Sequence, residues 1–330
     1  MLNIGLGKTL LIHHWDTDGI CSAAIILEKL SNDDITTWVP PLGTFYLTDD
    51  HIGMAQSYDN VVICDMALPE SNVSQIAEKS NIVMIDHHHQ DPIAGITHIN
   101  PVAEGASGED YPSNTWVLKE YLGLPLSLKI VLGYVGDREQ KIKENPVFWE
   151  ITKEYMREKG INFDELLKLV YRIDSNYKVG DREAVMKAPR LLKMYNTEDD
   201  ILENKQWAEN LSHLKKKLEE TLLEPPEEVD GTQIKRLDTP YAIISQVTRK
   251  LAWGTGIDTV VINTGFFDDQ DQLYCRSNKV NMHDLIERAK ELGYNAGGKK
   301  DVLGTIIPKS ESEKFLAETI EYLKKNKLKG

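Results

Sequence analysis

The stretch Val83-Met84-Ile85-Asp86-His87-His88-His89 constrains this 330-residue chain more than any other. A short apolar run, typical of a buried strand, leads directly into one carboxylate and three imidazoles. Such side chains pack poorly in a protein core, but they are good ligands for divalent metal ions. The stretch therefore predicts a strand whose end lies at a metal site.

Three other segments repeat this pattern of an apolar run that ends in acidic residues. They are residues 10–19, which contain His14, Asp16, Asp18 and Gly19; residues 61–65, which end in Asp65; and residues 133–137, which end in Asp137. In the N-terminal part of the chain, short apolar runs alternate with segments that read as helix or loop, which favours a doubly wound parallel sheet. Ligands bind such sheets beyond the carboxyl ends of the strands, where these acids are expected.

The spacing of the acids suggests how they would share a metal site. Asp16 and Asp18, two residues apart in an extended strand end, point the same way and could serve adjacent ions. An oxygen-rich site with few imidazoles suits Mn²⁺ better than Zn²⁺. A single strand-end acid such as Asp65 is more often a turn or cap residue. The prediction of a metal site therefore rests on the occurrence of acids and histidines at several strand ends together. Of the adjacent histidines, we place the ligands on His14 and His87 and leave His13 and His89 as neighbours.

Taken in order, these motifs resemble those of the DHH phosphoesterase superfamily, which includes RecJ-type exonucleases, nano-RNases, cyclic-dinucleotide phosphodiesterases and family II pyrophosphatases. The resemblance is closest to the RecJ-like and nano-RNase-like members of archaeal type. It implies two Mn²⁺ ions per site, which Mg²⁺ or Co²⁺ could replace. The implied ligands are His14, Asp16 and Asp65 on one ion, and Asp18, Asp65, His87 and Asp137 on the other, with Asp65 as the bridge. His88 would contact the scissile phosphate, and Asp86 would orient a histidine.

The C-terminal part of the chain is similar to the DHHA1 substrate domain. The similar residues are Cys275-Arg276-Ser277-Asn278, Gly297-Gly298 and Gly304. The resemblance implies that Arg276, Ser277, Asn278, Gly297, Gly298, Lys299 and Gly304 bind substrate. The family usually has histidine after the double glycine, and Lys299 stands here instead. Lysine can hold a phosphate as a point charge, but it does not exchange protons at neutral pH as imidazole does. Two structural alternatives remain. The glycines and Lys299 could form a hairpin whose lysines are solvated, and Arg276 could be an exposed structural arginine.

We therefore expect an α/β protein with a doubly wound parallel-sheet DHH domain over residues 1–195. A helical linker over 196–230 and a smaller α/β DHHA1-like domain over 231–330 follow. In the first domain the expected strands are 9–14, 35–39, 60–65 and 81–86, with a helix at 20–30. In the second domain they are 241–246, 258–266, 272–277 and 303–307. Helices are expected at 282–292 and from Glu311, with a glycine loop between the first of them and the last strand. Ser113-Asn114-Thr115 is either a helix N-cap or a substrate contact.

Composition limits the expected cellular location of the protein and the size of its substrate. The net charge of −14 would repel a long polyanion, which favours a short or small phosphoester. Three isolated cysteines predict reduced thiols and a cytoplasmic protein, and no run approaches the roughly 20 apolar residues of a membrane helix.

The sequence thus predicts an Mn²⁺-dependent phosphoesterase. It would hydrolyse the phosphodiester bonds of short or single-stranded oligonucleotides to nucleoside monophosphates, through a hydroxide held by two metal ions. The partner would be a short oligonucleotide, a single-stranded nucleic acid end or a cyclic dinucleotide, and a homodimer is left open. The alternatives are a cyclic-dinucleotide phosphodiesterase and a non-catalytic structural DHH protein of a replication assembly. A pyrophosphatase is disfavoured, because its Lys/Arg-rich C-terminal signature is not found.

Overall fold

The computed structural model describes residues 4–30 and 34–327, and the chain divides into two compact units. The first unit takes in the chain up to Tyr177 together with Asp181–Asn210, and the second takes in Lys178–Gly180 and the chain from Leu211. Helix α10 (Lys205–Leu223) belongs to both, because its Trp207 lies in the first core and its Leu214 in the second. The segment predicted as a linker thus contributes side chains to both cores.

The first unit is built on a five-stranded parallel sheet. Its strands are β1 (Thr9–His13), β2 (Ile35–Trp38), β3 (Asn60–Cys64), β4 (Asn81–Ile85) and β5 (Thr97–Ile99), in the spatial order β2-β1-β3-β4-β5. Every residue of β1 and β3 is buried, as expected for strands covered on both faces. The four strands predicted for this domain are confirmed, while β5 was not foreseen.

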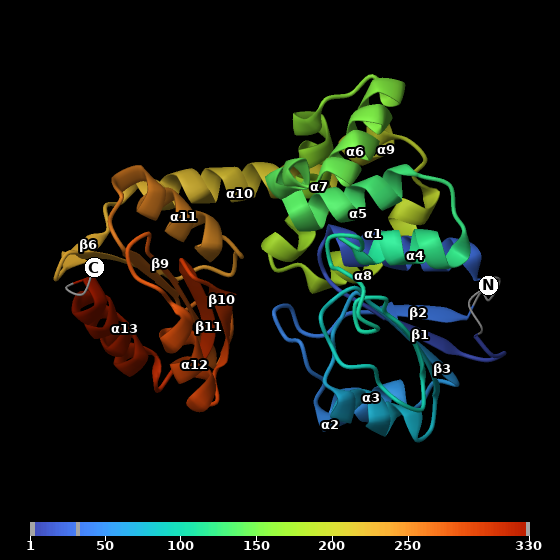
Figure 1. Cartoon of the computed structure of the whole chain (residues 1–330), viewed down its shortest axis with the longest axis horizontal. Coiled ribbons are helices and arrows are strands. Elements are labelled where there is room, and N and C mark those ends of the chain that lie inside the picture. The colour runs from blue at the N-terminus through green and yellow to red at the C-terminus, as the bar shows by residue number, and fades with distance from the viewer. Residues whose placement is uncertain (1–3, 31–33, 328–330) are drawn as a thin grey trace. The chain divides into compact units, whose positions relative to one another are not determined.

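Helices cover both faces of this sheet. The helices of the first unit are α1 (Thr17–Lys29), α2 (Asp49–Ala55), α3 (Glu70–Ala77), α4 (Asn114–Leu122), α5 (Leu128–Arg138), a 3-10 turn η1 (Glu139–Glu144), α6 (Pro146–Lys159), α7 (Phe163–Lys178), α8 (Arg182–Met194) and α9 (Glu198–Leu202). Figure 1 shows α2 and α3 on one face of the sheet, and α1, α4 and α8 on the other. The predicted doubly wound parallel sheet is therefore confirmed. Its strand order reverses between β1 and β3, which is where ligands gather in such folds.

The prediction of a strand at 133–137 is wrong, because these residues lie in helix α5. A short apolar run reads alike as a buried strand or a buried helix. The two glycines of this run have a packing role instead. A Cβ on Gly133 would lie 2.4 Å from Asp18 Oδ1, and one on Gly136 would lie 3.2 Å from Thr17 Cβ. The glycines therefore let α5 approach the start of α1, which brings Asp137 to the sheet edge from a helix.

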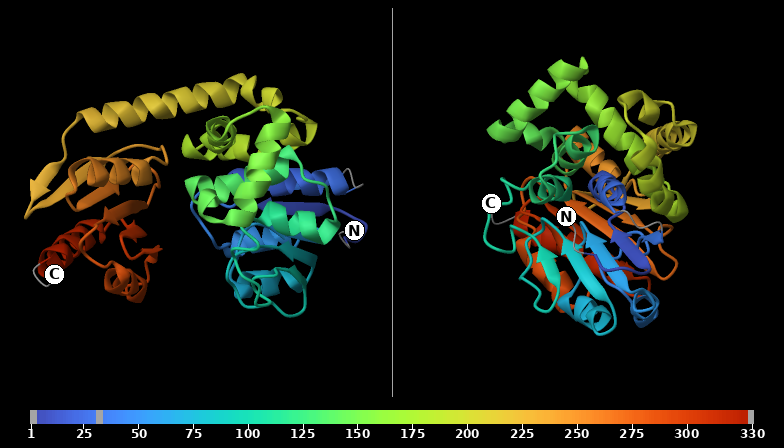
Figure 2. Two further views of the ribbon diagram at one scale, coloured as in Figure 1. Left: turned by 45° about the horizontal axis from the view of Figure 1, so that its top comes forward. Right: turned by 90° about the vertical axis from the view of Figure 1, so that its right-hand side faces the viewer.

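The second unit holds a six-stranded mixed sheet. Its elements are β6 (Glu227–Val229), β7 (Thr232–Leu237), α11 (Ile244–Thr255), β8 (Thr259–Asn263), β9 (Gln270–Arg276), α12 (His283–Glu291), β10 (Asn295–Lys299), β11 (Val302–Pro308) and α13 (Ser312–Lys327). The spatial order is β10-β11-β9-β8-β7-β6, and among these pairs only β7 and β8 run parallel. Val261 belongs to the same buried cluster as Val247 of α11, whereas its neighbour Val260 belongs to the cluster that contains Phe315 of α13. Helices thus cover both faces of this sheet too (Figure 2), and the second α/β domain is confirmed.

Two expectations for the second unit are wrong. Residues 241–246 form no strand: 241–243 are a bend, and 244–246 are the first residues of α11. Gly297 and Gly298 lie in strand β10 rather than in a loop. A Cβ on Gly298 would lie 2.0 Å from the carbonyl oxygen of Val302, so the tight hairpin requires glycine there. Strands β6 and β7 were not foreseen. Within residues 4–30 and 34–327, none of the helices is long and apolar enough to cross a membrane.

We predict that Gly133→Ala destabilises the protein by about 1–3 kcal/mol or more, because the added methyl group would overlap Thr115 and Asp18. Gly53→Ala is the matched control, since Gly53 also lies in a helix and a Cβ there would meet nothing within 4 Å. It should stabilise the protein by about 0.5–1 kcal/mol. Urea unfolding midpoints measure both effects, and equal midpoints for the two variants would contradict the close approach of α5 to α1.

Candidate metal centre

Three neighbouring strands of the first unit end at chemically active side chains. His14 follows β1, Asp65 follows β3 and Asp86 follows β4, and the backbone hydrogen-bond ladder continues through all three. Asp65 adopts a positive φ of 60°, which is uncommon outside glycine and is found at sites where structure around the residue enforces it. The end of β3 is therefore held in an unusual conformation where its carboxylate is presented.

The predicted metal ligands lie together in groups of close donor atoms. His14, Asp16 and Asp65 form one group, Asp18, His87 and Asp137 form a second, and Asp65, Asp86, His87 and His88 form a third, with the donor atoms of each group within 4.8 Å of one another. His87 Nε2 lies 3.3 Å from Asp65 Oδ1 and 3.1 Å from Asp137 Oδ2. All six predicted ligands thus fall in two adjoining groups, and Asp65 lies beside both.

The two acids of the first motif are separated by a helix start, not by an extended strand as predicted. Asp16 is the N-cap of α1, where its Oδ1 accepts from Gly19 N at 3.1 Å and lies 2.9 Å from His14 Nδ1. Asp18 lies one residue inside α1 and faces α4 and α5 instead. Because the helix begins between them, the two carboxylates point in different directions and belong to different groups of donor atoms. A Cβ on Gly19 would lie 2.5 Å from His14 Cβ, so glycine is required for this close approach.

Backbone amides hold the buried carboxylate of Asp18. Its Oδ2 accepts from Asn114 N at 2.6 Å, and its Oδ1 accepts from Thr115 N at 3.0 Å. Ser113 is the N-cap of α4, so the sequence alternative of a helix cap is confirmed for it. The first amides of α4 thus point at Asp18, where the helix dipole favours negative charge.

The electrostatics of the centre are those of acids buried together. Burial, with the Asp137 carboxylate nearby, raises the pKa of Asp18 to about 7. Burial and the charge of Asp18 raise the pKa of Asp65 well above its usual range. Burial alone would lower the pKa of His87, but contacts with Asp137 and Asp65 raise it well above the usual value. Without a cation, this arrangement opposes the ionised carboxylates that it gathers.

The residues fit divalent ions. His14 Nε2, Asp65 Oδ1 and His87 Nε2 are buried and have no hydrogen-bond partner within the described residues. The other ring nitrogen of His87, Nδ1, lies 3.3 Å from the carbonyl oxygen of Tyr111, to which it can donate. That contact aims Nε2 at the carboxylates, where it can bind a metal ion once its proton is released, as metal-binding histidines commonly do. Mn²⁺ or Mg²⁺ ions would supply the partners that these atoms lack.

Asp86 holds the neighbouring histidine, His88. Its Oδ1 accepts from the backbone nitrogens of His87 and His88, and from His88 Nδ1 at 2.7 Å. Burial would raise the pKa of Asp86, but the hydrogen bonds from His88 and the charges of His88 and His87 together outweigh it and keep this pKa below the usual value. The His88 side chain is 49 % exposed, so its Nε2 is directed away from Asp86 with room for a substrate.

The other two histidines of the motifs lie outside these groups. His13 is buried, with its Nδ1 2.7 Å from the carbonyl oxygen of His14, and burial lowers its pKa to about 4. His89 is exposed. Neither belongs to a group of ligand atoms in the described residues.

The predicted substrate residues of the second unit gather on one part of its sheet. Arg276 of β9 and Lys299 of β10 both pair with Val302 of β11, the strand between them. Their side chains therefore lie on the same face of the sheet. Arg276 contacts Asp301 Oδ2 at 3.0 Å and lies over the ring of Trp253, whose side chain is 59 % exposed. On that face Gly297 leaves open space above it, and Gly304 makes room for the ring of Tyr274. Ser277 is buried and its hydroxyl accepts from the turn that follows, while Asn278 is exposed.

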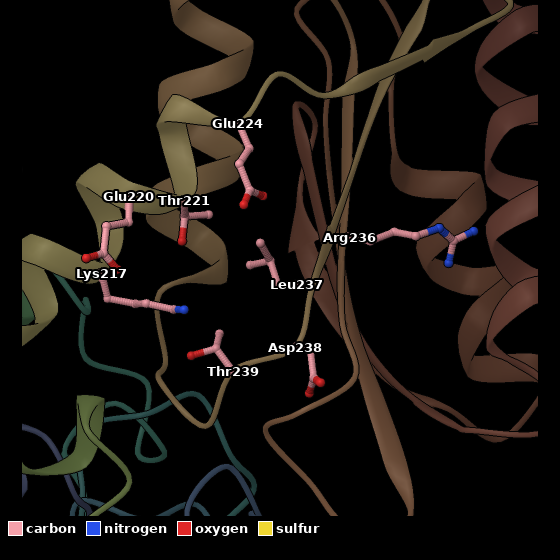
Figure 3. Close-up of a pocket in the computed structure, with 8 residues that line it drawn as sticks. All are labelled: Lys217, Glu220, Thr221, Glu224, Arg236, Leu237, Asp238 and Thr239. Atoms are coloured by element: carbon pink, nitrogen blue, oxygen red, sulfur yellow. The ribbon is translucent and has the colours of Figure 1, made fainter.

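A separate pocket of about 270 Å³ lies between α10 and β7 in the second unit (Figure 3). Its lining carries charges of both signs, and Arg236 points away from it, toward Glu313. None of the predicted site residues lines this pocket. We assign it no part in the metal centre.

A family match covers the N-terminal part of the chain. Residues 8–145 match the model of the DHH family, N-terminal domain. This part of the chain is a DHH-family domain. No curated protein matches the sequence. The DHH-family match covers β1 to α5, and so includes every residue of the candidate metal centre.

Solved structures resemble this chain in fold at low sequence identity. RecJ from Thermus thermophilus in complex with Mn²⁺ is 16 % identical with a TM-score of 0.63, covering 94 % of this chain and 51 % of its own. The chain thus spans about half of that RecJ. Another exonuclease RecJ bound to manganese is 18 % identical with a TM-score of 0.61, covering 94 % and 88 %. The pGpG-specific phosphodiesterase PggH from Vibrio cholerae is 16 % identical with a TM-score of 0.52, covering 97 % and 99 %.

Several residues of the DHH centre were missed by sequence reasoning. Asp174 accepts from Thr17 N at 2.9 Å and from the Thr17 hydroxyl, which fixes the first turn of α1. Tyr111 and Phe45 contact His87 and His14 respectively. The amides of residues 114 and 115 were flagged only as a cap or a substrate contact. No motif marks these contacts, because they join segments far apart in the sequence.

We predict that Asp65→Asn stabilises the metal-free protein and abolishes its stabilisation by Mn²⁺. The raised pKa of Asp65 means that the folded state opposes its charge at pH 7, so a neutral amide should raise the unfolding temperature by about 2–6 °C. Asparagine tolerates the positive φ, which keeps the backbone unchanged. In the wild type, Mn²⁺ at 100 times its Kd should add about 2.7 kcal/mol. Thermal unfolding with and without Mn²⁺ measures both; a wild type indifferent to Mn²⁺ would exclude the metal centre.

Proposed function

We propose that this protein is a metal-dependent phosphoesterase that hydrolyses phosphodiester bonds of short or single-stranded oligonucleotides to nucleoside monophosphates. The observation that carries the proposal is the convergence of six ligands from four segments on two adjoining groups in a DHH domain. A purely structural protein has no need of this costly arrangement of buried acids, which weighs against the non-catalytic alternative.

The residues of the centre would have different roles in such a reaction. His14, Asp16 and Asp65 would hold one ion, and Asp18, Asp65, His87 and Asp137 the other. When bound, two ions would supply a hydroxide nucleophile and withdraw charge from the phosphoryl oxygens. Asp86 fixes the ring of His88, whose exposed edge can then donate to a phosphoryl oxygen when the ring is doubly protonated. The metal we favour is Mn²⁺, with Mg²⁺ as a substitute, because oxygen ligands predominate.

The second unit would bind the remainder of the substrate as a DHHA1-like domain. Arg276 is held in place by Asp301 and Trp253, which leaves a planar cation beside an exposed aromatic ring. This pair suits a phosphate and a base next to each other. Lys299 adds positive charge on the same face in place of the usual histidine.

A dinucleotide, linear or cyclic, is the second candidate substrate. Two observations favour it: the net charge of −14 and the resemblance to PggH, which covers nearly the whole of both chains. A small substrate meets the acidic surface only at the site itself. The candidates differ in substrate length, which an assay can separate.

The proposed function is tested by product analysis with Mn²⁺ on a labelled RNA dinucleotide, single-stranded DNA and RNA 20-mers, and a cyclic dinucleotide. Release of monophosphates is expected, and relative rates sort the candidates. We predict that His88→Ala lowers kcat by about 10²–10³-fold, because it removes a donor to the transition state. The stabilisation by Mn²⁺ should stay intact. His89→Ala, an exposed neighbour outside the groups, is the control and should match the wild type. An inert wild type that binds Mn²⁺ would refute the proposal for these substrates.

We also predict that Arg276→Ala raises KM by about tenfold or more with little change in kcat, because a charged hydrogen bond to substrate is lost. Arg236→Ala is the matched control: Arg236 lies on the same sheet and forms a comparable pair with Glu313. It should leave KM unchanged. A normal KM for Arg276→Ala would rule out this arginine as a substrate ligand.

A further inference from the structure

Phe45 places an aromatic ring directly against the metal centre. It lies in the loop between β2 and α2, and its ring stacks on that of His14 with 5.6 Å between centroids and 28° between planes. It also contacts Trp15, at 5.0 Å between centroids. Yet 46 % of Phe45 remains exposed. One side of the ring therefore covers a candidate metal ligand, while the other is open to solvent.

Both ends of this loop are fixed to the rest of the first unit. The Arg182 guanidinium donates to the carbonyl oxygens of Val39 and Pro40. At the other end, Leu47 N donates to Asn72 Oδ1 at 2.7 Å, and the Leu47 side chain is buried. These anchors pre-position Phe45 before any ligand arrives, which lowers the entropy that binding must overcome.

We propose that Phe45 is the stacking surface for the base of the nucleotide whose phosphate lies at the metal centre. The inference rests on the proposed function, and it identifies the substrate as a base-bearing phosphoester. A base placed on the open side of Phe45 lies one ring beyond His14, so one nucleotide can reach both the stack and the metal ligands. Stacking on an aromatic ring tolerates any base. It also does not depend on positive charge, which suits a chain with a net charge of −14.

Phe45 could instead only shield His14 from water, and the two roles differ in what they discriminate. A shield protects the metal centre whatever the substrate, so its loss affects all phosphoesters alike. A stacking surface acts only on substrates that carry a base.

The test compares an RNA dinucleotide with matched dinucleotides that are abasic at one position or the other. In Phe45→Leu, KM for the intact dinucleotide should rise by about 5- to 100-fold, while one abasic substrate should be unaffected. Phe45→Trp should keep the preference for the base. Tyr121→Leu removes an equally exposed aromatic residue from α4 and should change neither substrate. Equal losses on intact and abasic substrates would overturn the proposal in favour of the shield.

A binding measurement separates this inference from the proposed function. With Mg²⁺, 2-aminopurine riboside monophosphate should lose fluorescence on stacking in the wild type and in Phe45→Trp, but not in Phe45→Leu. Quenching that depends on Phe45 supports the stack even where no dinucleotide is hydrolysed. Quenching that persists in Phe45→Leu, or is absent from the wild type, would overturn it.

Discussion

The first unit depends on one electrostatic constraint: several carboxylates are buried side by side around Asp65. Burial and mutual repulsion raise the pKa of Asp18 and Asp65, which is the signature of acids that disfavour one another's charge. The fold offsets this in part with donors that it can supply, namely the first amides of α4, which donate to Asp18. Buried ligand atoms on His14, Asp65 and His87 still lack partners in the described residues. The fold thus brings these acids together more closely than its own donors can satisfy, and divalent cations are the natural complement.

The same constraint explains why the start of α1 carries so many long-range contacts. Thr17 donates hydrogen bonds to Asp174 of α7, and Asp18 accepts hydrogen bonds from the first amides of α4. Gly19 touches His14, and Gly133 of α5 approaches Asp18. Three other helices are therefore positioned by the first turn of α1, which also carries the candidate metal ligand Asp18. Rigid elements hold ligands more accurately than loops do, and here the turn with the candidate ligand is itself a point where helices join.

Sequence reasoning reached the parallel sheet, because continuous apolar strands that end in acids are a strong local signal. It placed His14, Asp65 and His87 at strand ends that the structure brings together. It erred where a short apolar run has two readings: 133–137 is helix α5, and 241–246 leads into α11. Gly298 was read as part of a loop, since sequence does not reveal that a hairpin partner approaches its backbone. Contacts such as Tyr111 to His87 leave no local signature at all.

Under the proposed function, an acidic chain must obtain its affinity for a phosphoester without a broad positive surface. Metal ions would concentrate positive charge at one point, and Arg276 and Lys299 add cations on one face of the second sheet. Exposed rings such as Phe45 and Trp253 would bind bases through dispersion and π faces, which net charge does not oppose. A longer nucleic acid gains little from such a site, because the net charge of −14 opposes its further phosphates. The net charge, more than the candidate metal ligands, therefore favours a short substrate.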